Sequence, residues 1–253
     1  MQFFSKYLPA LLFFIFLIVA WEEVVNILKI NSQILPSPSA IFAAYSDHVL
    51  SLMPHIGQTM LETIIGLGLA IVLGVSFAIV LRLSARIRQA LYPLLIASQT
   101  IPIIALAPLL LIWFGFTLLP KIIVVTLFCF FPIAVAFFDG MEKISPQFIK
   151  LLQSMGATRL QILYLAEMPG ALPSFFSGLR IAAAYSVTGA IVGEYVGGYQ
   201  GLGIYMQNAA HSYAVTLVFV TIVIASLLSL LLFAAVAVLE KIFVPWNTAT
   251  KSK

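Results

Sequence analysis

The feature that most constrains this chain is a series of long apolar segments, each long enough to cross a lipid bilayer as a helix. A membrane-spanning helix needs about 20 predominantly apolar residues, because the hydrocarbon layer is roughly 30 Å thick. We therefore predict an all-α membrane protein with six transmembrane helices in a single membrane domain, residues 1–253. The predicted spans are residues 8–28, 59–81, 91–115, 120–138, 172–196 and 215–239.

The composition argues against a soluble protein and against a metal centre. Hydrophobic residues make up 62% of the chain and charged residues 9%, whereas soluble domains carry about 25% charged residues. The 20 Phe and 9 Tyr are far too many for a disordered chain. The single Cys129 excludes an internal disulfide and is too little for a zinc or iron–sulfur site. We expect His48 and His55 to be plain surface histidines, and His211 has no acidic or cysteine neighbour that would complete a metal site.

The distribution of basic residues predicts the orientation of the spans. Cytoplasmic loops of membrane proteins carry an excess of Lys and Arg. In a six-span arrangement Lys29 and Lys121 are the only flanking basic residues on one side, so we place that side outside and both termini in the cytoplasm. This orientation accounts for the pI of about 9.2 without a nucleic acid. The cytoplasmic residues are then Lys6, Arg82, Arg86, Arg88, Lys143, Lys150, Arg159, Lys241, Lys251 and Lys253.

Two expectations concern the first apolar segment and the loop after it. Ile18-Val19-Ala20 is a poor site for a signal peptidase, so we expect the first span to be retained. In the outer loop that follows, Ser37 or Ser39 is placed to cap a short helix over residues 40–49, lying at the membrane surface.

The loop over residues 139–169 is long, polar and divided by helix signals. Ser145-Pro146 predicts a helix start, because serine caps and proline at the first helical position loses no needed hydrogen bond. Gly156 suits the left-handed turn that ends a helix. Thr158 and Gln161 have the spacing of a capping box that opens a second helix, which Pro169 is expected to close. The apolar residues of the first helix fall on one face and are Phe148, Leu151, Leu152 and Met155.

This helix–elbow–helix loop has two interpretations. It is either a surface hairpin that merely joins the fourth and fifth spans, or a docking element for a cytosolic partner. As a docking element, a compact elbow held clear of the bilayer would fit a groove on the partner and transmit force to both spans.

Several short motifs extend over the core formed by residues 59–246. Those on the cytoplasmic side are Met155-Gly156-Ala157-Thr158, Pro169-Gly170-Ala171-Leu172-Pro173 and Gly178-Leu179-Arg180-Ile181-Ala182. The others are Gln99-Thr100-Ile101-Pro102, Pro108-Leu109, Trp113-Phe114-Gly115 and Gly201-Leu202-Gly203. Together, and in this order along the chain, these motifs resemble the binding-protein-dependent ABC importer permeases, in particular the nitrate, sulfonate and taurine branch.

The resemblance implies the type I ABC importer permease fold, with cytoplasmic coupling helices between the fourth and fifth spans. It implies a bacterial inner-membrane protein whose partners are two cytosolic ATP-binding subunits, an extracytoplasmic solute-binding protein and a second permease copy, as a homodimer. One departure is that the family's Glu-Ala-Ala tripeptide is replaced by Lys150-Leu151-Leu152, which puts in doubt any contact requiring the glutamate. The residues that the resemblance assigns to coupling are Lys150, Met155, Gly156, Ala157, Thr158, Glu167 and Pro169.

The resemblance also points to a class of solute. The stretches over residues 182–187 and 193–198 are similar to permeases for thiamine pyrimidine precursors and related heteroaromatic compounds. The alternative is a sulfonate, nitrate or taurine-like anion, for which Arg180 alone provides little positive charge at membrane depth.

The spans contain polar and small residues that are candidates for a solute pathway. Small residues form two stripes at four-residue intervals, which either pack within one subunit or, for the fifth span, line a pathway shared by two subunits. The stripe of the second span is Gly66, Ala70, Gly74 and Ala78, and that of the fifth span is Gly178, Ala182, Ser186 and Ala190. Arg180 is expected to anchor at the cytoplasmic headgroups, Glu62 to be interfacial, and Glu194 either to be solvated at the outer interface or to face solute or binding protein. The candidate pathway residues are Ser98, Gln99, Thr100, Ser186, Glu194 and Tyr195.

The sequence offers no catalytic constellation. It contains no phosphate loop of the Gly-x-x-x-x-Gly-Lys form, no His-Glu-x-x-His motif and no nucleophile elbow. We therefore predict a transport subunit that is not an enzyme, needs no cofactor and has no ATPase site of its own. The competing class is a secondary transporter driven by an ion gradient, against which the scarcity of membrane carboxylates argues.

Overall fold

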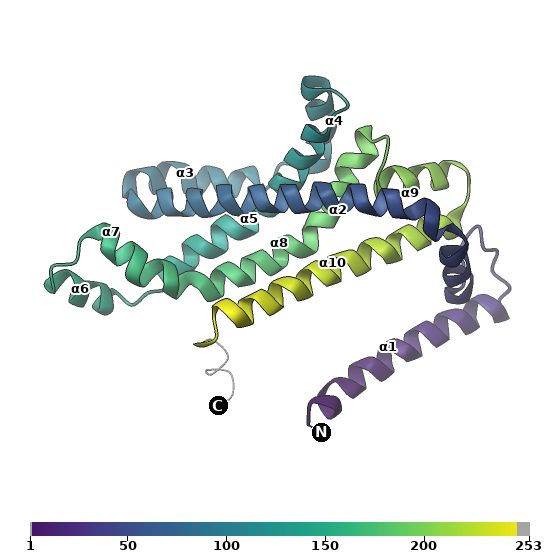
Figure 1. Cartoon of the computed structure of the whole chain (residues 1–253), viewed down its shortest axis with the longest axis horizontal. Helices are drawn as coiled ribbons and strands as arrows, with labels where there is room; N and C mark the ends of the chain where they lie inside the picture. The colour runs from purple at the N-terminus through teal and green to yellow at the C-terminus, as the bar shows by residue number, and fades with distance from the viewer. Residues whose placement is uncertain (1, 247–253) are drawn as a thin grey trace.

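The computed structural model of the chain describes residues 2–246, and all regular secondary structure in that range is helical (Figure 1). This confirms the predicted all-α class. The helices are α1 (Gln2–Ile27), α2 (Pro38–Leu83), α3 (Ala85–Ser98), α4 (Ile103–Phe114), α5 (Leu118–Glu142), α6 (Pro146–Ser154), α7 (Arg159–Ile162), the π-helical turn η1 (Leu163–Glu167), α8 (Met168–Gly197), α9 (Leu202–His211) and α10 (Val215–Phe243).

Five helical segments of the described chain are long and apolar enough to cross a membrane. They comprise residues Leu8–Ile27 of α1, then α2, α5, the continuous helix Arg159–Gly197 and α10. The third predicted span, residues 91–115, is not one straight helix, because α3 and α4 meet at 97°. The break falls just before Pro102, where proline has no N–H to donate and disfavours helix in the residue before it.

Helix α2 is longer than the predicted span. Ser37 is its N-cap, as anticipated, and its side-chain oxygen accepts a hydrogen bond from the Ala40 amide at 3.3 Å. The short surface helix predicted over residues 40–49 is not a separate element, since it continues into the second span as one helix of 46 residues. Pro54 lies inside this helix, and Figure 1 shows the beginning of α2 turned away from the remainder. Proline is a common cause of such a kink.

The core is formed by α5 and α8 packed against each other and against α2. The predicted small-residue stripes are what allows this close approach. A Cβ atom added at Gly66 would lie 2.5 Å from Val125 Cβ on α5, and one added at Gly178 would lie 2.5 Å from Ala136 Cβ, also on α5. Ala182 and Ala190 of the second stripe are fully buried. Both stripes therefore pack within this chain, which agrees with the interpretation that they serve packing within one subunit.

The ends of the helices fit the predicted orientation. The end of α2, the start of α3, the elements α6 and α7 and the end of α10 lie toward one end of the bundle (Figure 1). These segments carry most of the basic residues that the orientation argument uses, while Lys251 and Lys253 lie outside the described residues. Helix α1 stands apart from the bundle, and its apolar side chains are mostly exposed. The orientation itself stays a prediction.

Candidate functional site: the cytoplasmic elbow and the outer polar cluster

The elbow between α6 and α7 has the local structure that the sequence predicts. The Ser145 side chain accepts a hydrogen bond from the Phe148 amide at 3.1 Å, with Pro146 in the first helical turn. Gly156 has a φ angle of +84°, which is the left-handed conformation that favours glycine. The Thr158 amide donates to Gln161 Oε1 at 2.8 Å and the Gln161 amide donates to Thr158 Oγ1 at 3.3 Å, forming the capping box.

The elbow presents an apolar surface that the chain does not cover. The side chains of α6 are all at least partly exposed, and Met155 is 74% exposed. A Cβ atom added at Gly156 would meet nothing within 4 Å. Lys150 and Thr158 are also exposed. We call the exposed apolar residues here the elbow face; they are Phe148, Leu151, Met155 and Leu160. Clustered exposed apolar groups of this kind mark interaction sites.

The second limb of the elbow differs from the prediction, because Pro169 does not close it. Residues Arg159–Gly197 form a continuous helix, in which the π-helical turn Leu163–Glu167 precedes Pro169. The wider turn is closed by the Met168 amide donating to the Leu163 carbonyl, and Pro169 occupies the first turn of α8, where its missing N–H is tolerated. The elbow is therefore joined directly to the fifth span.

Glu167, one of the predicted coupling residues, lies inside this junction rather than on the elbow face. Its side chain is 8% exposed and forms an ion pair with Arg82 at the end of α2. Arg82 Nε donates to Glu167 Oε2 at 2.9 Å, and Arg82 Nη2 donates to Glu167 Oε1. Arg159 Nη2 in turn donates to the Arg82 carbonyl at 2.8 Å. The assignment of the seven coupling residues as a contact surface stays a prediction, and Glu167 is better suited to an internal role.

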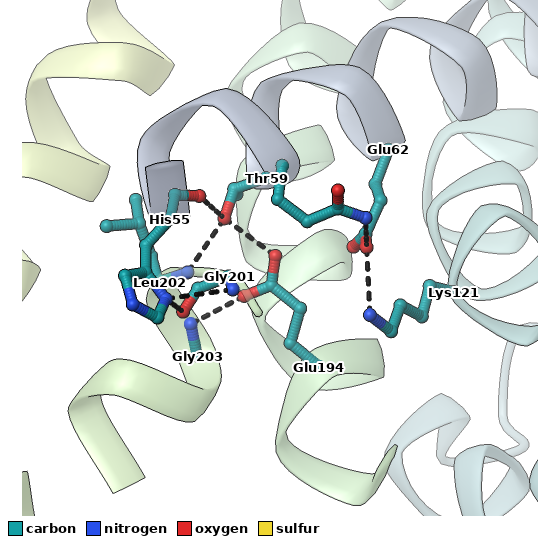
Figure 2. A network of polar contacts seen from close by, with 9 residues as sticks. His55, Thr59, Glu62, Lys121, Glu194, Gly201, Leu202 and Gly203 are labelled. Carbon is teal, nitrogen blue, oxygen red and sulfur yellow. Dashed lines mark hydrogen bonds and ion pairs between the residues drawn. The ribbon is translucent and has the colours of Figure 1, made fainter. Parts of the chain in front are cut away.

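At the opposite end of the bundle, which the predicted orientation places outside, a buried polar cluster holds the first turn of α9 (Figure 2). We call the side chains of His55, Thr59, Glu62, Lys121 and Glu194 the outer cluster. Three consecutive backbone amides of that turn donate to side chains of α2 and α8. The Gly201 amide donates to His55 Nδ1 at 3.1 Å, the Leu202 amide to Thr59 Oγ1 at 2.9 Å, and the Gly203 amide to Glu194 Oε2 at 2.5 Å. Thr59 Oγ1 also donates to Glu194 Oε1 at 2.6 Å, which ties α2 to α8.

A second part of the outer cluster is the ion pair between Glu62 and Lys121. Lys121 Nζ on α5 lies 3.0 Å from Glu62 Oε1 on α2, and Gln58 Nε2 donates to the same oxygen at 2.8 Å. The side chains of Glu62 and Lys121 are 0% and 7% exposed. Glu62 Oε2 is buried and finds no hydrogen-bond partner among the described residues.

The outer cluster corrects three predictions. Glu62 is buried rather than interfacial, and the Glu194 carboxylate is fully buried rather than solvated. His55 is partly buried against Gly201 and Tyr205 rather than a plain surface histidine. The reason is the same in each case, because burial comes from elements far away in the sequence. The sequence did contain one indication of a buried ion pair, because Lys121 is a basic residue on the predicted outer side, where few basic residues occur.

The remaining candidate pathway residues are not gathered into one site by the described chain. Ser98 Oγ donates to the Leu95 carbonyl and Thr100 Oγ1 to the Ala97 carbonyl, so both hydroxyls serve the backbone beside the break. Ser186 is buried and donates to the Ala183 carbonyl at 2.8 Å, whereas Gln99 and Tyr195 are exposed. A role of these residues in the pathway stays a prediction.

Arg180 has a partner within the chain. Its Nη2 atom lies 3.3 Å from Glu240 Oε2 on α10, and it donates to Ser177 Oγ at 3.4 Å. This pairing supports an anchoring role for Arg180.

Helix α8 exposes a face opposite to its small-residue stripe. Ile181 and Tyr185 on this face are 50% and 53% exposed, and Tyr195 is 38% exposed. Thr188 is exposed between them. Spacings of four, seven and fourteen residues from Ile181 place these side chains on one side of the helix. We call Ile181, Tyr185, Thr188 and Tyr195 the α8 face.

Comparison with known proteins places this architecture among transport proteins. Residues 70–245 match the family of binding-protein-dependent transport system inner membrane components. The formylaminopyrimidine transport permease protein ThiX of Halalkalibacterium halodurans is 42% identical over 93% of this chain and 94% of its own length. The riboflavin transport system permease protein RibX of Chloroflexus aurantiacus is 34% identical over 92% and 88%. The taurine transport system permease protein TauC of Escherichia coli is 27% identical over 91% and 86%.

A solved structure has the same fold. A chain of the MetNI methionine ABC transporter in inward-facing conformations superposes with a TM-score of 0.69. The likeness covers 78% of this chain and 98% of that one, at 21% sequence identity. It confirms the predicted importer permease fold.

Proposed function

This chain belongs to the family of binding-protein-dependent transport system inner membrane components, and from that premise we propose that its elbow receives the ATP-binding subunit of an ABC importer. The chain is the multi-pass permease subunit of such an importer, in the bacterial inner membrane. An importer of this family includes an ATP-binding subunit and a solute-binding protein, so we assign ATP hydrolysis to the former and solute delivery to the latter.

The observation that carries the docking proposal is the uncovered apolar elbow face. Phe148, Leu151, Met155 and Leu160 are between 47% and 74% exposed, on a segment whose caps give it a defined shape. A helix on the surface of a soluble protein ordinarily turns its apolar residues toward the core and carries polar residues on its outward face. Lys150, which stands at the position of the family's glutamate, is exposed and places a positive charge beside this apolar surface.

The assembly we propose has two copies of this chain and two ATP-binding subunits, with both chain termini in the cytoplasm. ATP-driven closure of the ATP-binding subunits would draw the two elbows together and open the pathway outward, and hydrolysis would reset it. This is a two-state equilibrium that a ligand at a distant site biases.

For the solute we propose formylaminopyrimidine or a related heteroaromatic compound, such as a thiamine pyrimidine precursor. Support comes from the 42% identity to the formylaminopyrimidine permease, against 27% for the taurine permease. Arg180, the one cation deep in α8, lies 3.3 Å from Glu240, whose negative charge weakens its attraction for an anion.

We propose that the solute passes along the α8 face, which includes the predicted pathway residue Tyr195. Tyr185 and Tyr195 present exposed aromatic rings on this face, and aromatic rings stack with one another in offset or edge-to-face geometry. Replacing Tyr185 by Leu should raise the KM for a pyrimidine, whereas Phe at this position should keep it near the native value.

Reconstituted uptake tests the proposal. Vesicles containing this chain and its ATP-binding subunit, supplied with the solute-binding protein, should accumulate formylaminopyrimidine only when ATP is present. Uptake of taurine in place of the pyrimidine would favour the anion alternative. Uptake by the chain alone, driven by an ion gradient, would contradict the proposal and favour a secondary transporter.

A further inference from the structure

The junction between the elbow and α2 combines apolar packing with polar contacts. Leu163 of η1 lies in the same apolar cluster as Leu81 of α2. Beside it, a cavity of about 260 Å³ lies between α6 and the end of α2, and Arg82, Arg159 and Glu167 are among the residues that line it. Arg159 donates to the Arg82 carbonyl, and Glu167 accepts from the Arg82 guanidinium. Arg82 thus supplies the polar contact of α2 with the elbow's second limb.

The Arg82–Glu167 pair has the geometry of a rigid connection. Two guanidinium nitrogens of Arg82 face the two oxygens of the Glu167 carboxylate, and a bidentate pair of this kind holds orientation as well as distance. The side chains are 22% and 8% exposed, so water competes little for them. The nearby pair of Arg88 and Glu142 is different, because each of its side chains is 40% exposed.

The position of Glu167 makes this connection relevant to movement. Glu167 is the last residue of the π-helical turn through which the elbow continues into α8. A π-helical turn is a local irregularity often found at functional sites, and here Pro169 follows within two residues. Movement of the elbow would therefore reach α8 directly through the chain, whereas α2 is linked to this junction by side-chain contacts, of which the Arg82–Glu167 pair is the ionic one.

We propose that Arg82 is a positioning residue for energy coupling, which makes α2 move together with α8 when the elbow is displaced. This inference rests on the proposed docking of the elbow to the ATP-binding subunit. It extends that proposal by naming the contact that passes the movement to a second span, outside the motifs by which the family resemblance was recognised.

The outer cluster lies at the opposite end of the bundle, where the predicted second span, residues 59–81, begins. Thr59 on α2 and Glu194 on α8 bond to each other and to adjacent amides of α9. If α8 moved without α2, this outer cluster would be pulled apart. With Arg82 in place, α2 and α8 are tied at both ends, so the outer cluster moves as one body.

The test uses the whole reconstituted importer with three permease variants. Arg82→Gln removes the charge and the bidentate contact, and Arg88→Gln is the matched control on the exposed pair. The reversed pair Arg82→Glu with Glu167→Arg restores an ion pair of opposite polarity. For each we measure photo-crosslinking from position 155 to the ATP-binding subunit, ATP hydrolysis, and the number of solute molecules transported per ATP.

We expect Arg82→Gln to keep the crosslink and ATP hydrolysis while transport per ATP falls about tenfold, since breaking one partner of a buried pair removes its constraint. Arg88→Gln should stay within about twofold of the native ratio, because exposed pairs contribute little. The reversed pair should recover most of the native ratio, which a merely destabilising change would not do.

Two results would overturn the inference while leaving docking intact: native transport per ATP in Arg82→Gln with the crosslink present, or failure of the reversed pair to recover any transport in correctly folded protein. If the importer with an otherwise native permease shows no crosslink from position 155 to the ATP-binding subunit, the docking proposal itself is contradicted. If Arg82→Gln does not accumulate in the membrane, Glu167→Gln breaks the same charge pair with little change of shape and is judged by the same ratio.

Discussion

Two glycine turns, one at each end of the bundle, show how positive φ angles serve different purposes. Gly156 and Gly201 have φ angles of +84° and +139°, and each precedes a short helix. At Gly201 the space that a side chain would need is filled by the Glu194 carboxylate, whereas at Gly156 nothing lies within 4 Å. The turn at Gly201 is enclosed by its own chain, and the turn at Gly156 is left open.

The polar and apolar groups around the two turns differ in the same way. At the outer cluster, buried side chains satisfy adjacent backbone amides from within the molecule. At the elbow, caps satisfy the backbone locally and leave apolar side chains facing outward. We conclude that changes in the outer cluster should act on stability, and changes in the elbow should act on transport.

The largest effect on stability is expected from Lys121→Ala. This variant leaves the fully buried Glu62 carboxylate without its cation, and breaking a buried pair costs about 3–5 kcal/mol. The free energy of unfolding in detergent should fall by that amount, while Lys143→Ala, on an exposed lysine, should leave it within about 0.5 kcal/mol. A Lys121→Ala variant as stable as the native protein would contradict the conclusion that changes in the outer cluster act on stability.

A smaller loss of stability is expected from Gly201→Ala. The new methyl group would collide with the Glu194 carboxylate, and the φ angle of +139° is one that other residues rarely adopt. Strain of this kind costs about 1–3 kcal/mol. Gly57→Ala is the matched control, since it lies in α2 with open space around it and should not lower the melting temperature. Equal melting temperatures for both variants would contradict the account.

Gly156→Val should separate stability from transport. A side chain has room at this position, so the cost is limited to the left-handed backbone, about 1–2 kcal/mol. Because the turn that orients the elbow face is altered, ATP hydrolysis and solute uptake should become uncoupled although the protein still inserts into the membrane. Normal uptake by this variant would remove the elbow from the coupling pathway.

The smallest effect on stability is expected from Leu151→Ala on the elbow face. Leu151 is 55% exposed, so its truncation should change the free energy of unfolding by less than about 0.5 kcal/mol. Binding of the ATP-binding subunit should nevertheless weaken measurably in a pull-down titration. Leu50→Ala, at an 86% exposed leucine of α2, is the control that should change neither quantity.

The elbow could be predicted from the sequence because its determinants are local. Ser145 caps the amide of Phe148, and Thr158 and Gln161 cap each other, in both cases three residues apart. A single segment therefore contains all the information needed for these turns. The exception is Pro169. A proline ordinarily ends a helix, but here it follows a π-helical turn and lies in the first turn of α8.

The outer cluster could not be predicted because its partners are distant in sequence. Thr59 and Glu194 are 135 residues apart, and Glu62 and Lys121 are 59 apart. From the sequence alone each carboxylate looks like an isolated charge near the end of a span, for which solvation is the simplest expectation. Only the packing of α2, α5 and α8 brings their partners within reach and removes the water.

The most direct test of the account is photo-crosslinking from the elbow in native membranes. A photoreactive residue at position 155, where the native Met155 is 74% exposed, is compared with one at position 50, where Leu50 is 86% exposed on α2. The account predicts that an ATP-hydrolysing subunit is captured from position 155 and not from position 50. Failure to capture such a subunit from any of positions 155–158 would contradict it.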